Sequence, residues 1–519
     1  MHHLEELWET DRNASIVFNE LLDFNIFYYC LLLVNLIENL LQAPVQLREL
    51  LISECSHFQR FPESIGCLRQ LKKIAMRGRS EFWGLRSLPD EFCLLQSLEH
   101  LELNHCGELS LLPNNFGNLR SLRHLDLSNC KKLRMLPVSF KELTLLQQLN
   151  LEACSNLILE SDILENMTGL EYLKLSGCER LEELPRHVTN LASLTELYLF
   201  KQQRWLQCKK LREVPWNIGQ LSKLQKLSIG SELLTSLPTS IGDLSSLTSL
   251  EIYNCYKLEC LPESLGCLNL LENLQIFSSG VKSLSKSFRL LINLQTLEIS
   301  QCSISELDLG ARPFSSSFRN LKSINLRLIK VCKISISEDC CPALESLMLS
   351  LNKHLTEIDV LPMTVKRIEL ERCKILRNIR GIYSLVRIQT MRITGCPELD
   401  ALPNFAQYNF LRHFELRECH GVKKIAGLEH CRELVLLRVH TRWKEAGIES
   451  LEGMERLSRL DLKAISISVV EGCIRSMQAV PDAASLLNSF DFSNLSVVDS
   501  FANQKISSRP SIKRQSSAC

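Results

Sequence analysis

The chain has 519 residues, with 60 Lys and Arg against 59 Asp and Glu, and a formal net charge of +1. That balance argues against nucleic-acid binding by the chain as a whole, because such proteins carry a clear basic excess. Leu occurs 100 times, about 19% of the residues, which is roughly twice its ordinary share. Excess Leu in a long chain of ordinary charge favours one leucine-based repeat array over three or four separate domains.

Residues 1–46 precede the repeats. Residues 26–37, IFYYCLLLVNLI, are apolar but number only a dozen, whereas a spanning helix needs roughly 20. The stretch also begins too late, behind Asp23, for a typical signal peptide. We therefore predict a hydrophobic cap over the first repeat. A membrane segment or a remnant of a preceding region of a longer protein is the alternative.

From residue 47 the sequence repeats the frame LxxLxLxxC followed by LxxLP, as in residues 122–137, LRHLDLSNCKKLRMLP. Its eighteen starts are Leu47, Leu71, Leu98, Leu122, Leu146, Leu170, Leu194, Leu224, Leu247, Leu271, Leu294, Leu321, Leu344, Val365, Ile388, Leu411, Leu434 and Leu457. Their spacings run from 21 to 30 residues. Leucine-rich repeats have a period of roughly 20–29 residues and this signature, so residues 47–480 are predicted to form such an array.

The frame alternates apolar with polar residues, as a half-buried strand does: Leu125 and Leu127 point inward, and Asp126 and Ser128 outward. One repeat cannot bury its own Leu set, but stacked repeats bury a continuous column beneath a parallel sheet. The Pro of the return segment, as in residues 136–146, suits the start of a short helical or 3₁₀ turn. We predict an α/β fold, a right-handed leucine-rich-repeat solenoid curved like a horseshoe, with a parallel concave sheet and about 18 repeats.

The chain contains 22 Cys, and ten of them lie eight residues after a repeat start. These are Cys55, Cys106, Cys130, Cys154, Cys178, Cys255, Cys302, Cys373, Cys396 and Cys419. A small, weakly polar thiol suits a tight buried turn after the strand. Neighbouring slots lie about 4.8 Å apart, so distance alone allows disulfides, but parallel side-chain directions favour free structural thiols. Many free thiols are typical of a reducing compartment, and we expect a cytoplasmic protein.

Catalytic and metal-binding motifs are missing from the sequence. No CxxC or HExxH occurs, and the adjacent Cys340 and Cys341 have poor chelate spacing. His100, His105 and Cys106 cluster on the third repeat, where a surface pair is favoured over a zinc site. The P-loop, GxSxG, HRD and DFG signatures are absent. We therefore expect no enzymatic activity, no cofactor, no metal and no small-molecule substrate.

Outward strand positions form the binding surface of a solenoid. Repeats three to five carry an acidic and polar strip, and the last repeats carry a mixed basic strip. The first comprises Glu102, Asn104, Asp126, Ser128, Asn150 and Glu152; the second comprises Arg392, Arg417, Arg438, His440 and Lys463 among Glu369, Glu371, Glu415 and Asp461. We interpret the second strip as a solvated mixed face, with a phosphate-rich partner as the alternative.

Aromatic residues are only 6% of the chain, yet five fall on outward positions of the middle repeats: Tyr172, Tyr198, Phe200, Tyr253 and Phe277. The seventh repeat is the longest, at 30 residues, and its extra loop adds Trp205 with Lys201, Arg204, Lys209 and Lys210 around it. Apolar rings left in water on one face indicate a partner site. We predict a protein-binding site at these six rings on the concave face. The alternative is that the rings pack on one another or that the loop covers them.

The repeat stops after residue 480. Residues 485–519 include ten Ser and carry Arg509, Lys513 and Arg514 near the C-terminus, a composition typical of a flexible tail. The predicted organisation is thus a cap or remnant at 1–46, the repeat domain at 47–480 and a Ser-rich tail at 481–519.

Residues 247–268, LTSLEIYNCYKLECLPESLGCL, show the pattern LxxLxLxxCxxLxxLPxxIGxL, as do residues 98–119 and 170–191. This pattern resembles the leucine-rich-repeat regions of plant intracellular disease-resistance receptors of the nucleotide-binding class. Receptor-kinase ectodomains instead use Asn in the slot and a GxIP return, and F-box repeats lack the LP return. The resemblance implies a domain that senses pathogen effectors or modified host proteins. It covers the sensor portion only, because the chain has no P-loop or nucleotide-binding domain.

Two functions remain open. The first is a non-enzymatic recognition module of plant innate immunity that binds an effector or host protein on its concave face, without nucleic acid or membrane. The second is an intracellular signalling scaffold of the Ras-group leucine-rich-repeat type, which shares LPxxIGxL returns but generally has Asn in the slot. The Cys slot and the irregular lengths of repeats seven and eleven favour the first.

Overall fold

The computed structural model describes residues 15–18, 47–53, 58–77, 84–202, 205–307, 318–440, 447–448, 454 and 456–463. The chain divides into two compact units, one of Met1–Leu307 with Phe314–Leu321 and one of Asp308–Pro313 with Lys322–Cys519. The division falls in the long eleventh repeat.

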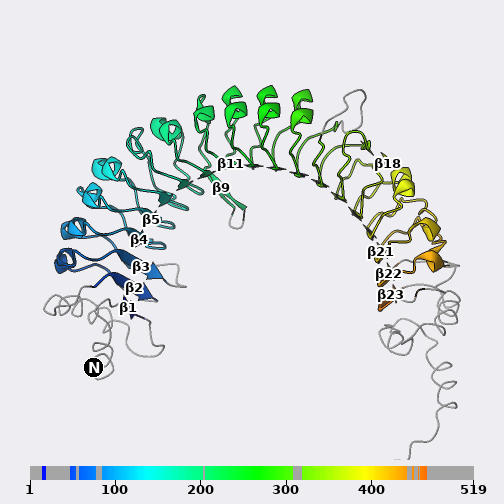
Figure 1. The fold of residues 1–519 in the computed structure, drawn as a ribbon, viewed down its shortest axis with the longest axis horizontal. Coiled ribbons are helices and arrows are strands. Elements are labelled where there is room, and N and C mark those ends of the chain that lie inside the picture. The colour runs from blue at the N-terminus through cyan, green and yellow to red at the C-terminus, as the bar shows by residue number, and fades with distance from the viewer. Residues whose placement is uncertain are drawn as a thin grey trace, which may run out of the picture. The chain divides into compact units, whose positions relative to one another are not determined.

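The first unit is built on a parallel sheet to which each repeat adds one strand (Figure 1). Its strands are β1 (Ser15–Phe18), β2 (Glu49–Ser53), β3 (Lys73–Arg77), β4 (His100–Glu102), β5 (His124–Asp126), β6 (Gln148–Asn150), β7 (Tyr172–Lys174), β8 (Glu196–Tyr198), β11 (Lys226–Gly230), β12 (Ser249–Tyr253), β13 (Asn273–Phe277) and β14 (Thr296–Ser300). Equivalent repeat positions pair directly, as Leu125 does with Leu101 and Leu149. Leu125 and Leu127 are buried beneath the sheet, as the alternation predicts.

The second unit repeats this arrangement with shorter returns. Its parallel strands are β15 (Ser323–Arg327), β17 (Ser346–Ser350), β19 (Arg367–Glu371), β20 (Thr390–Thr394), β21 (His413–Arg417), β22 (Leu436–His440) and β23 (Arg459–Lys463). A separate pair, β16 (Lys333–Ser335) and β18 (Glu357–Val360), runs parallel in two of the return segments. The predicted parallel sheet of a leucine-rich-repeat solenoid is confirmed in each unit.

Most of the other return segments form single 3₁₀ turns, one of the two outcomes that the LP dipeptide predicts. They are η2 (Glu63–Cys67), η3 (Asp90–Leu94), η4 (Phe116–Asn118), η5 (Val138–Glu142), η6 (Arg186–Asn190), η8 (Ile218–Gln220), η9 (Thr239–Asp243), η10 (Glu263–Cys267), η11 (Lys286–Leu290), η12 (Arg380–Ser384), η13 (Phe405–Gln407) and η14 (Leu428–His430). In η5 the amide of Phe140 donates to the carbonyl of Pro137 at 2.8 Å, and the Phe140 ring is fully buried. Pro cannot continue the strand, and it immediately precedes the turn in η2, η3, η5, η6, η9 and η10.

A left-handed residue follows the strand in most repeats, seven residues after the repeat start. These residues are His105, Asn129, Ala153, Gly177, Asn254, Ser278, Gln301, Leu328, Leu351, Arg372, Gly395 and Glu418. The reversal aims the next side chain back into the core, where the thiol of Cys130 donates to the carbonyl of Leu103 at 3.4 Å. Cys154 and Cys178 repeat this contact one repeat further on.

We call this row of thiols the Cys ladder. The described cysteines are free, as predicted, and Cys55 lies outside the described residues. The ladder also has a member that the frame did not predict: Cys208 lies fourteen residues after its repeat start, yet its thiol donates to the carbonyl of Leu175 at 3.2 Å. Burial raises the pKa of the Cys208 thiol to about 12. The Cys208 thiol is therefore protonated at neutral pH and acts as a structural hydrogen-bond donor.

Of the predicted N-terminal cap, the structure describes only β1, which pairs in parallel with β2. The structure does not describe the remainder of residues 1–46 or the predicted tail at 481–519. The side chain of Lys463, predicted to belong to the basic strip, also lies outside the described part. Within the part of the chain that is described, no helix is long and apolar enough to cross a membrane.

Candidate functional site

The seventh repeat inserts a β-hairpin between its strand and its ladder cysteine. Strand β9 (Phe200–Lys201) pairs antiparallel with β10 (Leu206–Gln207), after which Cys208 resumes the ladder. Figure 1 shows this hairpin beside β11, projecting from the sheet. The six residues by which this repeat exceeds the usual 24 thus form a separate element rather than a loose loop.

Four of the predicted rings form one contiguous group, which we call the aromatic stack: Phe200, Tyr253, Phe277 and Trp205. The centroids of Phe200 and Tyr253 lie 4.2 Å apart with the rings 19° from parallel, and those of Tyr253 and Phe277 lie 5.0 Å apart. Phe200 lies over Gly230 of β11, where a Cβ atom would stand only 2.5 Å from the ring. The glycine therefore makes the room in which the hairpin docks.

The burial of two rings corrects the prediction that all six are exposed on the outward face. Phe200 and Tyr253, expected to stand exposed, are only 1% and 2% exposed, because the hairpin covers the sheet and the rings pack on one another. This was the alternative that the sequence left open, and it holds for these two rings. Phe277 is half-buried at the end of the stack.

Polar contacts also fix the hairpin. The ammonium of Lys201 lies 2.9 Å from a carboxylate oxygen of Glu152, a residue predicted to face outward but only 7% exposed. The side chain of Gln207 donates to Glu232 at 2.6 Å and accepts from Asn254 at 2.9 Å. Because these partners come from three different repeats, the hairpin is held on both of its strands.

Trp205 is the ring that remains available. It is 63% exposed at the turn of the hairpin and touches Phe200 edge-to-face, with ring centroids 6.4 Å apart. Its backbone has a φ of 52°, a left-handed conformation that is an outlier for a bulky residue. The docked hairpin thus holds a large ring in solvent at a cost in backbone strain. Arg204, predicted beside it, lies outside the described residues.

Tyr198 and Tyr172 lie apart from the stack, on β8 and β7. Tyr198 is half-buried between the ammonium groups of Lys174 and Lys226, at 5.6 Å and 5.2 Å from the ring centroid. Burial, together with the hydrogen bond its hydroxyl donates to Glu196, raises the pKa of Tyr198 well above its ordinary value. Tyr172 lines a groove of about 420 Å³ on the same face of the sheet.

The histidines of the third and fourth repeats form a stacked pair. The ring centroids of His100 and His124 lie 4.3 Å apart. Burial, with the adjacent His124 and Lys73, lowers the pKa of His100. Among the described residues no group of three or more His, Cys, Asp or Glu is placed to hold a metal ion.

Family and structural comparisons agree on the repeat. A family model described as "Leucine-rich repeat region" matches residues 134–395, and one described as "Leucine Rich Repeat" matches residues 121–143. A search of curated proteins found no matching sequence.

Similar solved structures come from two bacteria and a plant. A leucine-rich-repeat protein of Leptospira interrogans has 21% identity over 86% of this chain and 97% of its own, with a TM-score of 0.55. The functional domain of InlJ from Listeria monocytogenes, which includes a cysteine ladder, has 16% identity over 62% and 67%, with a TM-score of 0.40. The ectodomain of the Arabidopsis thaliana receptor kinase GASSHO1/SCHENGEN3, in complex with CASPARIAN STRIP INTEGRITY FACTOR 2, has 16% identity over 81% and 68%, with a TM-score of 0.37. Likenesses at these identities show the fold alone.

Proposed function

The chain belongs to the leucine-rich-repeat family, and we propose that it is a non-enzymatic protein-binding module. Its partner docks on the first unit, on the face of the sheet that carries the outward side chains and the hairpin. The proposal centres on the docked hairpin and its exposed Trp205. One observation carries it: the seventh repeat inserts a hairpin, buries one of its rings on a glycine, and presents another in a strained, exposed conformation.

The energetics of protein interfaces support a binding site at Trp205 and the hairpin. Trp residues are among the commonest binding hot spots, because one ring buries a large area at a small cost in side-chain entropy. The contacts of Phe200, Lys201 and Gln207 hold the hairpin before any partner arrives. A partner then loses little free energy in ordering the site, which favours affinity.

We further propose that this binding is recognition of an effector or host protein in plant innate immunity. The Cys ladder and the LP returns support this, since both belong to the pattern that resembles disease-resistance receptors. Free thiols at the eighteen described cysteines support a reducing compartment such as the cytoplasm.

The test compares two exposed tryptophans. Trp205, at 63% exposure, stands on the hairpin, and Trp216, at 81%, follows Pro215 on a return segment. Tagged wild type, Trp205→Ala and Trp216→Ala proteins would be used to capture partners from native tissue, with quantitative mass spectrometry. We expect a specific partner that Trp205→Ala loses and Trp216→Ala retains. Equal recovery with all three would remove the hairpin from the binding site.

A further inference from the structure

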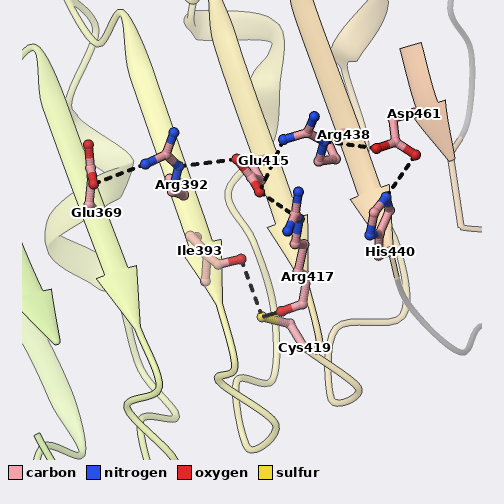
Figure 2. Close-up of polar contacts among 9 residues, drawn as sticks. All are labelled: Glu369, Arg392, Ile393, Glu415, Arg417, Cys419, Arg438, His440 and Asp461. Carbon is pink, nitrogen blue, oxygen red and sulfur yellow. Dashed lines mark hydrogen bonds and ion pairs between the residues drawn. The ribbon is translucent and has the colours of Figure 1, made fainter. Parts of the chain in front are cut away.

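The last five strands carry a row of alternately acidic and basic side chains at outward positions of the sheet. Their third positions are Glu369, Arg392, Glu415, Arg438 and Asp461, each directly opposite the next in the parallel register. Figure 2 shows the side chains linked from strand to strand. We call these residues the charge row.

One buried carboxylate organises the row. Glu415 is only 7% exposed, and its two oxygens lie 3.1 Å from Arg392, 2.6 Å from Arg417 and 3.6 Å from Arg438. Arg392 also reaches Glu369 at 3.3 Å, and Arg438 reaches Asp461 at 2.9 Å. The guanidinium groups are thus held in place, while Arg392 keeps half of its side chain exposed.

The first positions of the same strands differ in character. They are Arg367, Thr390, His413, Leu436 and Arg459, and none is acidic. Arg367 and Arg459 are exposed, and neither has an ion-pair partner among the described residues. A groove of about 360 Å³ is lined by residues of β19 to β22, among them Arg367, Glu369, Arg392, His413, Glu415 and Arg438. Arg459 does not line this groove; it lies beside Leu436 on the next strand and continues the row of first positions.

We propose that this groove binds an acidic segment of a partner protein that lies across the strands. Guanidinium groups bind carboxylates through paired hydrogen bonds, and Arg clusters recognise acidic motifs. Arg367 and His413 are two strands apart, or about 10 Å, as are His413 and Arg459. An extended peptide advances about 3.3–3.6 Å per residue, so acidic residues at every third position would match these side chains.

The carboxylates of the charge row favour this partner over a polyanion. Glu369 and Asp461 are each about a quarter to a third exposed on the same face. They would repel the continuous phosphates of nucleic acid or an anionic membrane, whereas separate carboxylates can sit beside the unpaired arginines. The groove belongs to the second unit, whereas the hairpin belongs to the first. A test of the groove therefore does not depend on the proposed function of the hairpin.

The test uses a fluorescent peptide with Glu at every third position in a Gly-Ser background, and a matched peptide with Gln. Binding to the full chain is followed by fluorescence anisotropy at low salt. The double variant Arg367→Gln/Arg459→Gln removes two guanidinium groups without breaking an ion pair of the described residues. Arg327→Gln on β15 is the control. Arg327 is also exposed and unpaired among the described residues, but it neither lines the groove nor belongs to the first positions of the last five strands.

We expect wild type to bind the Glu peptide saturably and the Gln peptide not at all. The double variant should bind at least about tenfold more weakly, and Arg327→Gln should stay within about twofold, with melting temperatures unchanged. No binding of the Glu peptide, or equal weakening by Arg327→Gln, would overturn the proposal. So would tighter binding, sensitive to the same double substitution, of single-stranded RNA or phosphatidylserine vesicles.

Discussion

Replacing Gly230 by Ala should undock the hairpin while the sheet beneath it stays folded. The added Cβ would stand 2.5 Å from Cδ2, 2.7 Å from Cβ and 2.8 Å from Cγ of Phe200, all below ordinary van der Waals contact. The backbone of Gly230 is not left-handed, so Ala meets no conformational penalty there. Phe200 must therefore shift away from Gly230, which disturbs its stacking on Tyr253. Overpacking of this kind costs about 1–3 kcal/mol, and the lost ring stacking adds about 0.5–1.5 kcal/mol.

Amide hydrogen exchange reports this cost directly. The amide of Cys208 donates to the carbonyl of Gly230 at 3.1 Å, at the base of the hairpin. If local opening becomes easier by about 1.4 kcal/mol or more, that amide should exchange at least about tenfold faster. In a Phe200→Gly background the same substitution of Gly230 should add little, because all three atoms that the new Cβ strikes are gone. Unchanged exchange in Gly230→Ala, or an equal penalty without the ring, would refute this account of docking.

Three further predictions concern the rest of the chain. Leu127→Ala should lower the free energy of unfolding by about 2–5 kcal/mol in chemical denaturation, because Leu127 is fully buried; a loss below 1 kcal/mol would contradict its core position. Glu415→Gln should cost about 1–3 kcal/mol, less than a fully buried pair because its arginine partners are partly exposed; an unchanged midpoint would mean the charge row adds no stability. Burial, with His124 and Lys73, lowers the pKa of His100, so the unfolded chain binds that proton more readily. Stability should therefore fall as pH drops through the unfolded pKa of about 6.5, and His100→Asn should lose part of that dependence, whereas an identical pH profile would contradict it.

The repeating parts of the fold were predictable because each repeat solves the same packing problem. The alternation around Leu125 predicted the strand, and Pro137 predicted the turn that closes the repeat. The charge row was also readable in principle, since Glu369, Arg392 and Glu415 are each 23 residues apart and so fall in register.

The candidate site was harder to predict because it depends on the seventh repeat, whose length departs most from the usual 24 residues. The outward position of Phe200 implied exposure, but exposure also depends on what covers the strand. The insertion covers its own strand, so the ring is buried and Trp205 is left as the exposed ring. The same insertion moved Cys208 out of the expected slot without removing it from the ladder. The sequence did not indicate that Gly230 belongs to the site, because its role depends on Phe200 lying above it in the folded structure.

A footprint of the captured partner tests the central claim most directly. Hydrogen exchange of the full chain would be measured with and without that partner. The account predicts slower exchange in peptides that cover residues 199–208 and β11–β13, and no change around the return turn η8. Protection confined to the return turns, with the hairpin amides unaffected, would contradict it.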